Sequence, residues 1–292
     1  MSDWLAVGDE TGNWDELYNP GAFLGVALVM GRIEDWQAAL QETIGGQRVK
    51  DRLQAPIRHL PPANRRSQTH HLKDAFDYWE RQRPGGEWLL AEPDGDPSRQ
   101  EVFATLRWLA EHPHLITLGL WGRGATLKPA LFRSDDPAVA LGQAYGLLVG
   151  QVLPFLNVED RLLVQPGLRS EPADSPARQR ATITKNPNND DARLHGHTRG
   201  TVSVLIDEGQ RYRQAWHGGA IAGFDAGVLV HLRKQYPSLG SVWLPNDVLN
   251  AIADLGAGLL RLSCQTGATQ LGLRREPSWT NVVLHSLEEI TT

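Results

Sequence analysis

The chain has 292 residues, of which 41% are hydrophobic and 22% charged, and its formal net charge is -5. This composition supports a substantial hydrophobic core, and the negative balance means that a polyanion would have to be bound by a local cluster of basic residues. The single cysteine, Cys264, excludes an internal disulfide and a zinc site built from several thiolates. It fits a reducing compartment, and because the sequence shows neither a signal peptide nor a membrane-spanning apolar run, we expect a soluble cytoplasmic protein.

The chain opens with two apolar runs, residues 4–8 and 22–30, separated by a polar, turn-rich stretch. This pattern predicts a buried β-hairpin. The first run leads directly into Asp9-Glu10-Thr11-Gly12, so two carboxylates come at the end of the first strand. Carboxylates are costly to remove from water unless a cation or a hydrogen-bond donor meets them. The end of this strand is therefore the first candidate for a functional site.

A basic segment follows the hairpin. Residues 33–41 have helical periodicity and predict a short helix, which Gly45-Gly46 ends. Residues 45–73 then carry seven basic side chains against a single acid, and three prolines prevent one continuous helix. The segment is either a surface that contacts nucleic-acid phosphates or a solvated, irregular surface. Its basic residues are Arg48, Lys50, Arg52, Arg58, Arg65, Arg66 and Lys73.

The middle of the chain alternates between predicted helices and strands. We expect helices over residues 72–81, 98–112 with Ser98 as the cap, and 137–155, and strands over residues 87–91, 115–121 and 161–165. Such alternation after an opening hairpin favours a mixed sheet flanked by helices. Residues 167–200 are poor in apolar side chains and predict a long functional loop or insertion.

The C-terminal part contains a second acidic strand end. Residues 201–206 form an apolar run that leads into Asp207-Glu208-Gly209, which repeats the pattern of the opening strand. A helix over residues 224–235 and a strand over residues 241–244 are expected next.

The last predicted helix covers residues 247–262, with Asn246 as its cap. A continuous apolar stripe follows one side of this helix and consists of Val248, Ile252, Leu255, Leu259 and Leu262. Asp254 belongs to an adjacent polar stripe, and its small neighbours Ala251, Ala257 and Gly258 would let the helix pack close to a sheet. The Asp254 carboxylate then either reaches the strand ends or faces water.

Three acidic positions therefore stand out: Asp9 with Glu10, Asp207 with Glu208, and Asp254. They converge if the two acidic strands are neighbours and the last helix crosses them. Converging carboxylates raise one another's pKa unless divalent cations neutralise them. Hard oxygen ligands select Mg²⁺ or Mn²⁺, and a pair of such ions supports phosphodiester cleavage.

Two short motifs resemble a known family. Asp9-Glu10-Thr11-Gly12 after an apolar strand resembles the N-terminal Asp-Glu-Ser-Gly motif of the bacterial domain of unknown function 3800 family, with threonine in place of serine. Ala253-Asp254-Leu255-Gly256-Ala257 resembles the Ala-Asp-Leu-x-Ala helix near the C-terminus of that family. The resemblance implies a ribonuclease H-like fold with Asp9 and Asp254 as metal ligands and Glu10 nearby. An interior acid is also expected, and we assign it to Asp207.

The sequence thus predicts a single α/β domain over residues 1–292, with a ribonuclease H-like mixed sheet flanked by helices and insertions at about residues 45–73 and 167–200. The expected function is Mg²⁺- or Mn²⁺-dependent hydrolysis of phosphodiester bonds in DNA or RNA, with Asp9, Glu10, Asp207 and Asp254 as the catalytic residues. The alternative is a catalytically inactive subunit on the same scaffold, which binds nucleic acid, a protein partner or a second copy of itself in a defence or mobile-element system.

Other motifs give weaker indications. A zinc site would draw on several histidines, but they lack thiolate partners and lie in polar loops, which argues against it. These histidines are His70, His71, His195, His197 and His217. The glycine-rich stretch at residues 218–223 is not followed by Lys and Ser or Thr, so a nucleotide-binding P-loop is not expected. A histidine close to the carboxylates would serve as a general base or contact a phosphate.

Overall fold

The computed structural model describes residues 3–84, 95–124, 144–145, 148, 151, 155, 161–166, 246–265 and 282–286. The elements predicted at residues 87–91, 201–209, 224–235 and 241–244 lie outside these ranges, as does the loop predicted at residues 167–200. The helix predicted at residues 137–155 falls largely outside them as well.

The protein is a mixed α/β structure built on a mixed sheet. Its strands are β1 (Asp3–Thr11), β2 (Phe23–Arg32), β5 (Ile116–Arg123), β6 (Arg161–Pro166) and β7 (Val282–Ser286), in the order β6-β1-β2-β5-β7. The pairs β1–β2 and β2–β5 are antiparallel, whereas β6 is parallel to β1 and β7 is parallel to β5. The predicted hairpin and the predicted strands at residues 115–121 and 161–165 are confirmed, whereas β7 was not predicted.

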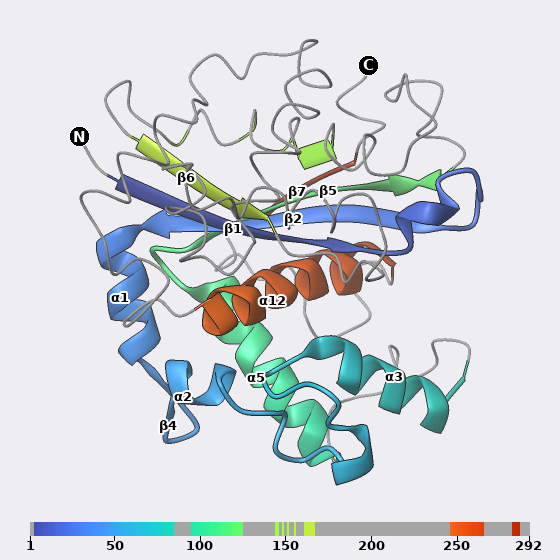
Figure 1. The fold of residues 1–292 in the computed structure, drawn as a ribbon, viewed down its shortest axis with the longest axis horizontal. Helices are drawn as coiled ribbons and strands as arrows, with labels where there is room; N and C mark the ends of the chain where they lie inside the picture. The colour runs from blue at the N-terminus through green and yellow to red at the C-terminus, as the bar shows by residue number, and fades with distance from the viewer. Residues whose placement is uncertain are drawn as a thin grey trace, which may run out of the picture.

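The labelled helices lie together on one side of this sheet (Figure 1). They are α1 (Ile33–Gln41), α2 (Val49–Leu53), α3 (Leu72–Gln82), α5 (Pro97–Glu111) and α12 (Asn246–Gln265). The chain also forms two 3-10 turns, η1 (Trp14–Glu16) and η2 (Pro62–Asn64). Helix α12 crosses β1, β2 and β5 and is contacted by α2, α3 and α5, whereas α1 packs against β1, β2 and α2. No described helix is both long enough and apolar enough to cross a membrane.

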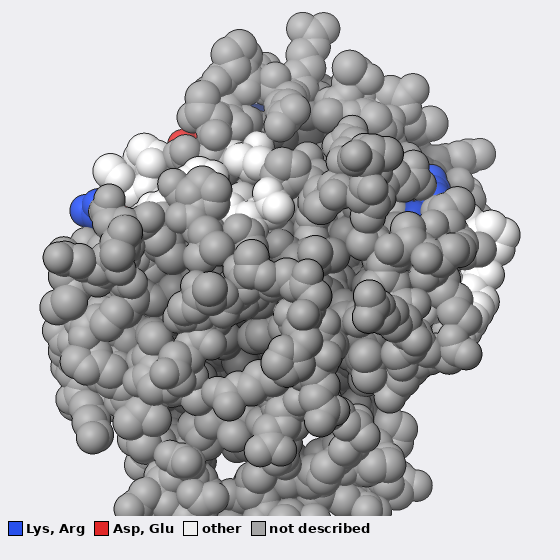
Figure 2. Space-filling view, turned by 90° about the horizontal axis from the view of Figure 1, so that it is seen from above, with Lys and Arg blue, Asp and Glu red and all other residues white. Residues whose placement is uncertain are grey.

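The alternation of side chains along β1 divides the core into two layers. Leu5 and Val7 belong to a cluster between the sheet and the helices, whereas Trp4 and Ala6 belong to a cluster on the opposite face. Successive residues of a strand point to opposite faces, so odd-numbered residues of β1 face the helices. The apolar stripe predicted for the last helix is confirmed, because all five of its residues are buried. Seen from above, the described residues that are visible are mostly uncharged, with Lys or Arg toward the left and right and an acidic side chain toward the upper left (Figure 2).

Two local predictions were wrong. Gly45 and Gly46 have positive φ angles of 58° and 79° and form the turn of a small hairpin between β3 (Thr43–Ile44) and β4 (Gln47–Arg48), which glycine favours because it has no Cβ. Helix α1 has already ended at Gln41. The cap of α5 is Asp96 rather than Ser98, since the Asp96 side chain accepts hydrogen bonds from the backbone N–H groups of the first turn.

Candidate functional site

Asp9 lies near the end of β1, on the face that the helices cover. It follows Leu5 and Val7 at intervals of two residues, and it pairs across the sheet with Ala27 of β2. Its Oδ1 accepts a hydrogen bond from the backbone N–H of Glu10 at 2.9 Å. Strand alternation turns the Asp9 side chain toward the helices, and the side chain of the neighbouring Glu10 lies within hydrogen-bond reach of the Asp9 carboxyl. Asp9 is therefore directed toward the helical layer, with Glu10 beside it.

Helix α12 approaches this end of the sheet unusually closely because small residues face each other there. Ala27 packs against Ala257 and Leu260. A Cβ on Gly256 would lie 2.7 Å from Cγ2 of Val29, and a Cβ on Gly25 would lie 2.8 Å from Cδ2 of Leu260, both closer than real contacts. The helix thus passes directly over the strand position that pairs with Asp9, and Asp254 comes one turn before Ala257.

Asp254 also contacts the start of α3. Its Oδ2 accepts a hydrogen bond from the backbone N–H of Leu72, the first residue of α3, at 2.6 Å. The side chain of Leu72 packs beside Gly258, where a Cβ would overlap it. The first N–H groups of a helix have no partner within the helix, so the Asp254 carboxylate satisfies one of them from a distant part of the chain. The prediction that Asp254 merely faces water therefore does not hold.

Asp254 lies close enough to Asp9 for its negative charge to act on the Asp9 carboxyl. The pKa of Asp9 is raised well above its ordinary value, first by burial and then by the negative charges of Glu10 and Asp254. Burial also raises the pKa of Asp254, while His71 and the N–H of Leu72 act in the opposite direction. Among the described residues, no Lys or Arg forms an ion pair with either carboxylate. Uncompensated negative charge in a partly buried place is the condition that a cation would relieve.

The start of α3 and the end of the predicted basic segment complete this region. Asp74 of α3 is buried, and its Oδ2 accepts a hydrogen bond from the backbone N–H of Ser67 at 2.8 Å, while its Oδ1 lies 3.3 Å from Nε of Arg66. Nδ1 of His71 lies 3.5 Å from Oδ1 of Asp74. His71 and Asp74 are three residues apart at a helix start, a spacing that brings side chains together. The spacing alone could have predicted the contact between His71 and Asp74. The sequence did not indicate that this pair lies beside Asp254.

The donor atoms here suit a hard divalent cation in type. Asp9 and Asp254 offer carboxylate oxygens, and Mg²⁺ is commonly held by one or two carboxylates together with water and substrate phosphates. Within the described ranges, however, no three His, Cys, Asp or Glu side chains are arranged around a common point for a metal ion. The predicted third and fourth acids, Asp207 and Glu208, lie outside the described residues.

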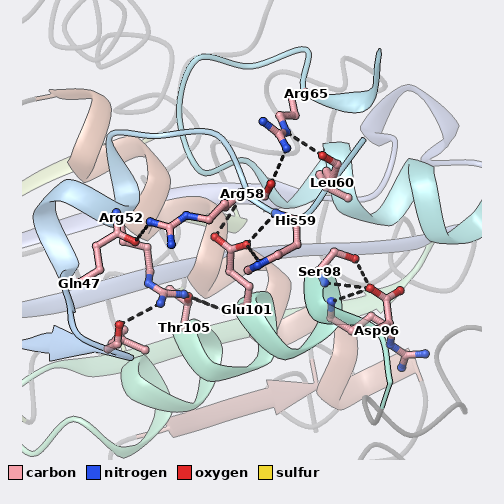
Figure 3. A network of polar contacts seen from close by, with 12 residues as sticks. Gln47, Arg52, Arg58, His59, Leu60, Arg65, Asp96, Ser98, Glu101 and Thr105 are labelled. Carbon is pink, nitrogen blue, oxygen red and sulfur yellow. Dashed lines mark hydrogen bonds and ion pairs between the residues drawn. The ribbon is translucent and has the colours of Figure 1, made fainter. Parts of the chain in front are cut away.

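The predicted nucleic-acid contacts do not form one uniform basic surface. Arg52 is only 8% exposed, and its guanidinium donates hydrogen bonds to the backbone oxygens of Ile44 and Glu101 and to Oγ1 of Thr105 (Figure 3). Burial lowers its pKa. This arginine therefore joins the β3–β4 hairpin to α5, and it is not part of the exposed surface.

The other predicted contacts are more accessible. Arg48, Arg58, Arg65 and Arg66 are exposed and Lys50 is partly exposed. Arg65 donates to the backbone oxygens of Leu60 and Arg58, and Arg66 pairs with Asp74 and Asp77. Arg58 donates to Gln47 beside a pocket of about 280 Å³, which Arg52, His59 and Glu101 also line (Figure 3). Comparisons of the chain with protein-family models, with curated proteins and with solved structures give no match.

Proposed function

We propose that the protein is a Mg²⁺- or Mn²⁺-dependent nuclease with a ribonuclease H-like fold, related to the domain of unknown function 3800 family. The observation that carries the proposal is the meeting of Asp9, at the end of the central strand β1, with Asp254, on the helix that crosses that strand. These are the acids of the two motifs that resemble the family. The order of the described strands, with an antiparallel β1–β2–β5 unit and β6 parallel to β1, is further support.

In this proposal, Asp9 and Asp254 hold the cation, and Asp207 is assigned as a further ligand. Glu10 has a supporting role, because its side chain hydrogen-bonds with the Asp9 carboxyl and its charge acts on Asp9. The bound ion would supply charge neutralisation at the phosphate and a more acidic water. The exposed side chains of Arg48, Lys50, Arg58, Arg65 and Arg66 would contact phosphates of the nucleic acid. Arg52 is left out of this surface because it is buried.

The proposal is tested by measuring metal binding and cleavage in the same variants. Mg²⁺ or Mn²⁺ should raise the thermal midpoint of the wild type, because a ligand that binds only the folded state stabilises it. Asp9→Asn and Asp254→Asn should lose this shift and should not cleave single- or double-stranded DNA, RNA or an RNA–DNA hybrid. Asp51→Asn, which removes an exposed acid from α2, is the matched control and should behave as the wild type.

One observation favours the alternative of a catalytically inactive subunit. Asp254 already has a structural partner in the N–H of Leu72, so its carboxylate could serve only to fix α3. In that case the wild type would bind nucleic acid or a protein partner without cleaving any of the four substrates with either ion. Asp254→Asn would then leave the response of the thermal midpoint to Mg²⁺ unchanged.

A further inference from the structure

The start of α3 brings a histidine to the edge of the carboxylate pair. The hydrogen bond from Leu72 N–H to Asp254 fixes the backbone at this point, and His71 is the residue immediately before it. The side chain of His71 is close enough to Asp254 for its charge to act on that carboxylate. His71 therefore occupies the rim of the same site, although it comes from the segment between the hairpin and α3.

The ring of His71 lies against a buried carboxylate, with which it forms an ion pair when protonated. Its Nδ1 faces Oδ1 of Asp74 at 3.5 Å, and the Asp74 carboxylate, only 6% exposed, is itself fixed by Ser67 and Arg66. A carboxylate that faces Nδ1 favours the tautomer and orientation in which Nε2 is directed away from it. Such pairs are often longer before substrate binds than during the reaction.

The opposite edge of the ring is open. The side chain of His71 is 41% exposed although its Nδ1 is buried and makes no hydrogen bond within the described structure, so the exposed part of the ring is the edge that carries Nε2. The side chain makes no capping hydrogen bond to α3, so the fold does not use it there. His70 differs in both respects, since it is 1% exposed and both of its ring nitrogens are buried. Of these two histidines, His71 is the one that lies against a buried carboxylate and also has an exposed ring edge near Asp254.

We propose that His71, oriented by Asp74, is the catalytic residue that protonates the leaving oxygen during phosphodiester hydrolysis. This inference rests on the proposed function. Water forms a bond to phosphorus while the bond from phosphorus to the leaving nucleoside oxygen breaks. That oxygen takes the proton from Nε2 of protonated His71, the attacking water releases one proton to solvent, and His71 regains a proton from solvent. The net change consumes one water and produces a phosphate monoester and an alcohol.

The test compares two leaving groups in the same oligonucleotide, the ordinary bridging oxygen and a bridging sulfur at the scissile position, with Mn²⁺ as the ion. His71→Gln should slow cleavage of the oxygen substrate by about 10²- to 10⁴-fold, the usual contribution of a general acid. It should slow the sulfur substrate only a few-fold, because a thiolate leaves without being protonated. Asp74→Asn should show the same pattern with a smaller loss, since it disturbs the orientation of the ring rather than removing it.

Two controls separate the possible outcomes. His71→Gln should keep the Mn²⁺-dependent rise in thermal midpoint that Asp9→Asn loses, and His114→Gln, at an exposed histidine before β5, should cleave as the wild type. Equal losses on both substrates, or no loss on either, would overturn the role of His71 while leaving the metal site intact. A wild type that cleaves neither substrate would instead overturn the proposed function on which the inference depends.

Discussion

At the scale of single residues, His70 and His71 show how adjacent identical side chains receive different properties from their surroundings. His70 lies in the helical layer, where its backbone N–H donates to the oxygen of Leu53, and neither ring nitrogen has a hydrogen-bond partner within the described structure. Burial is the main cause that lowers the pKa of His70 to about 4, with Arg52 and His71 acting in the same direction. His70 is thus a neutral core residue, whereas His71 faces water.

His70 should make the stability of the protein sensitive to acid. The unfolded chain protonates this histidine near pH 6.5 and the folded chain only near pH 4, so the free energy of unfolding falls as the pH drops through this interval. The difference corresponds to roughly 3 kcal/mol. Urea unfolding of wild type and His70→Leu between pH 4 and pH 7 should show a flatter profile for the variant. Parallel profiles would show that His70 is accessible to protons in the folded state.

At the scale of elements, the close approach of α12 to β2 decides whether the carboxylates can meet. Gly25 and Ala27 of β2 and Gly256 of α12 leave no space for larger side chains at the crossing. Interiors are packed as densely as organic crystals, so a single methyl group at such a crossing has to displace the helix or strain a neighbour. The small residues of this crossing are therefore a requirement of the site as well as of the core.

Gly25→Ala tests this requirement. The new methyl would lie 2.8 Å from Cδ2 of Leu260 and 3.1 Å from the backbone oxygen of Leu120, so we expect a loss of about 1–3 kcal/mol in the free energy of unfolding. Gly21→Ala, at an exposed loop position where the nearest atom would be 3.4 Å away, is the matched control and should be neutral or slightly stabilising. Chemical denaturation measures both. Equal stability of the two variants would mean that α12 adjusts freely over the sheet.

At the scale of the whole molecule, the site joins the two ends of the chain. Asp9 belongs to the first strand and Asp254 to the last described helix, and each carries a pKa that burial and charged neighbours raise. A raised carboxyl pKa means that the folded state binds the proton more tightly than the unfolded state. Well below pH 3.8, the ordinary pKa of an aspartate, neither acid changes the free energy of unfolding through its ionisation. As the pH rises from 3.8 through the pKa of the folded state, each acid lowers the free energy of unfolding.

A double-mutant cycle at pH 7 without divalent cations measures the repulsion between the Asp9 and Asp254 carboxylates. Asp9→Asn and Asp254→Asn should each stabilise the protein, on the order of 1 kcal/mol, as replacements of strained functional groups commonly do. Asparagine at 254 can still accept the hydrogen bond from Leu72. The double variant should gain at least about 0.5 kcal/mol less than the sum, because either replacement removes the same repulsion. Strict additivity would show that the two carboxylates do not interact.

Much of the sheet and helix layout could be predicted from local patterns. The hairpin, the helix at residues 33–41 and the apolar stripe of the last helix all follow from hydrophobic periodicity, which reflects the fixed geometry of each element. The positions of turns and helix caps do not follow from hydrophobic periodicity. Gly45 and Gly46 suit both a helix end and a tight hairpin turn, and Asp96 and Ser98 are both residue types that cap helices. In each case the packing of the neighbouring segments determines which of the two structures forms.

By itself, the sequence determined that acids stand at the end of an apolar strand and on an amphipathic helix with small neighbours. Only the tertiary structure decided which of them meet, because convergence depends on the pairing order of strands and on the distance at which α12 crosses them. It directed Asp9 toward the helices, placed the start of α3 against Asp254, and buried Arg52. The reason is physical: periodicity fixes which face of an element a side chain occupies, whereas its partners depend on long-range packing.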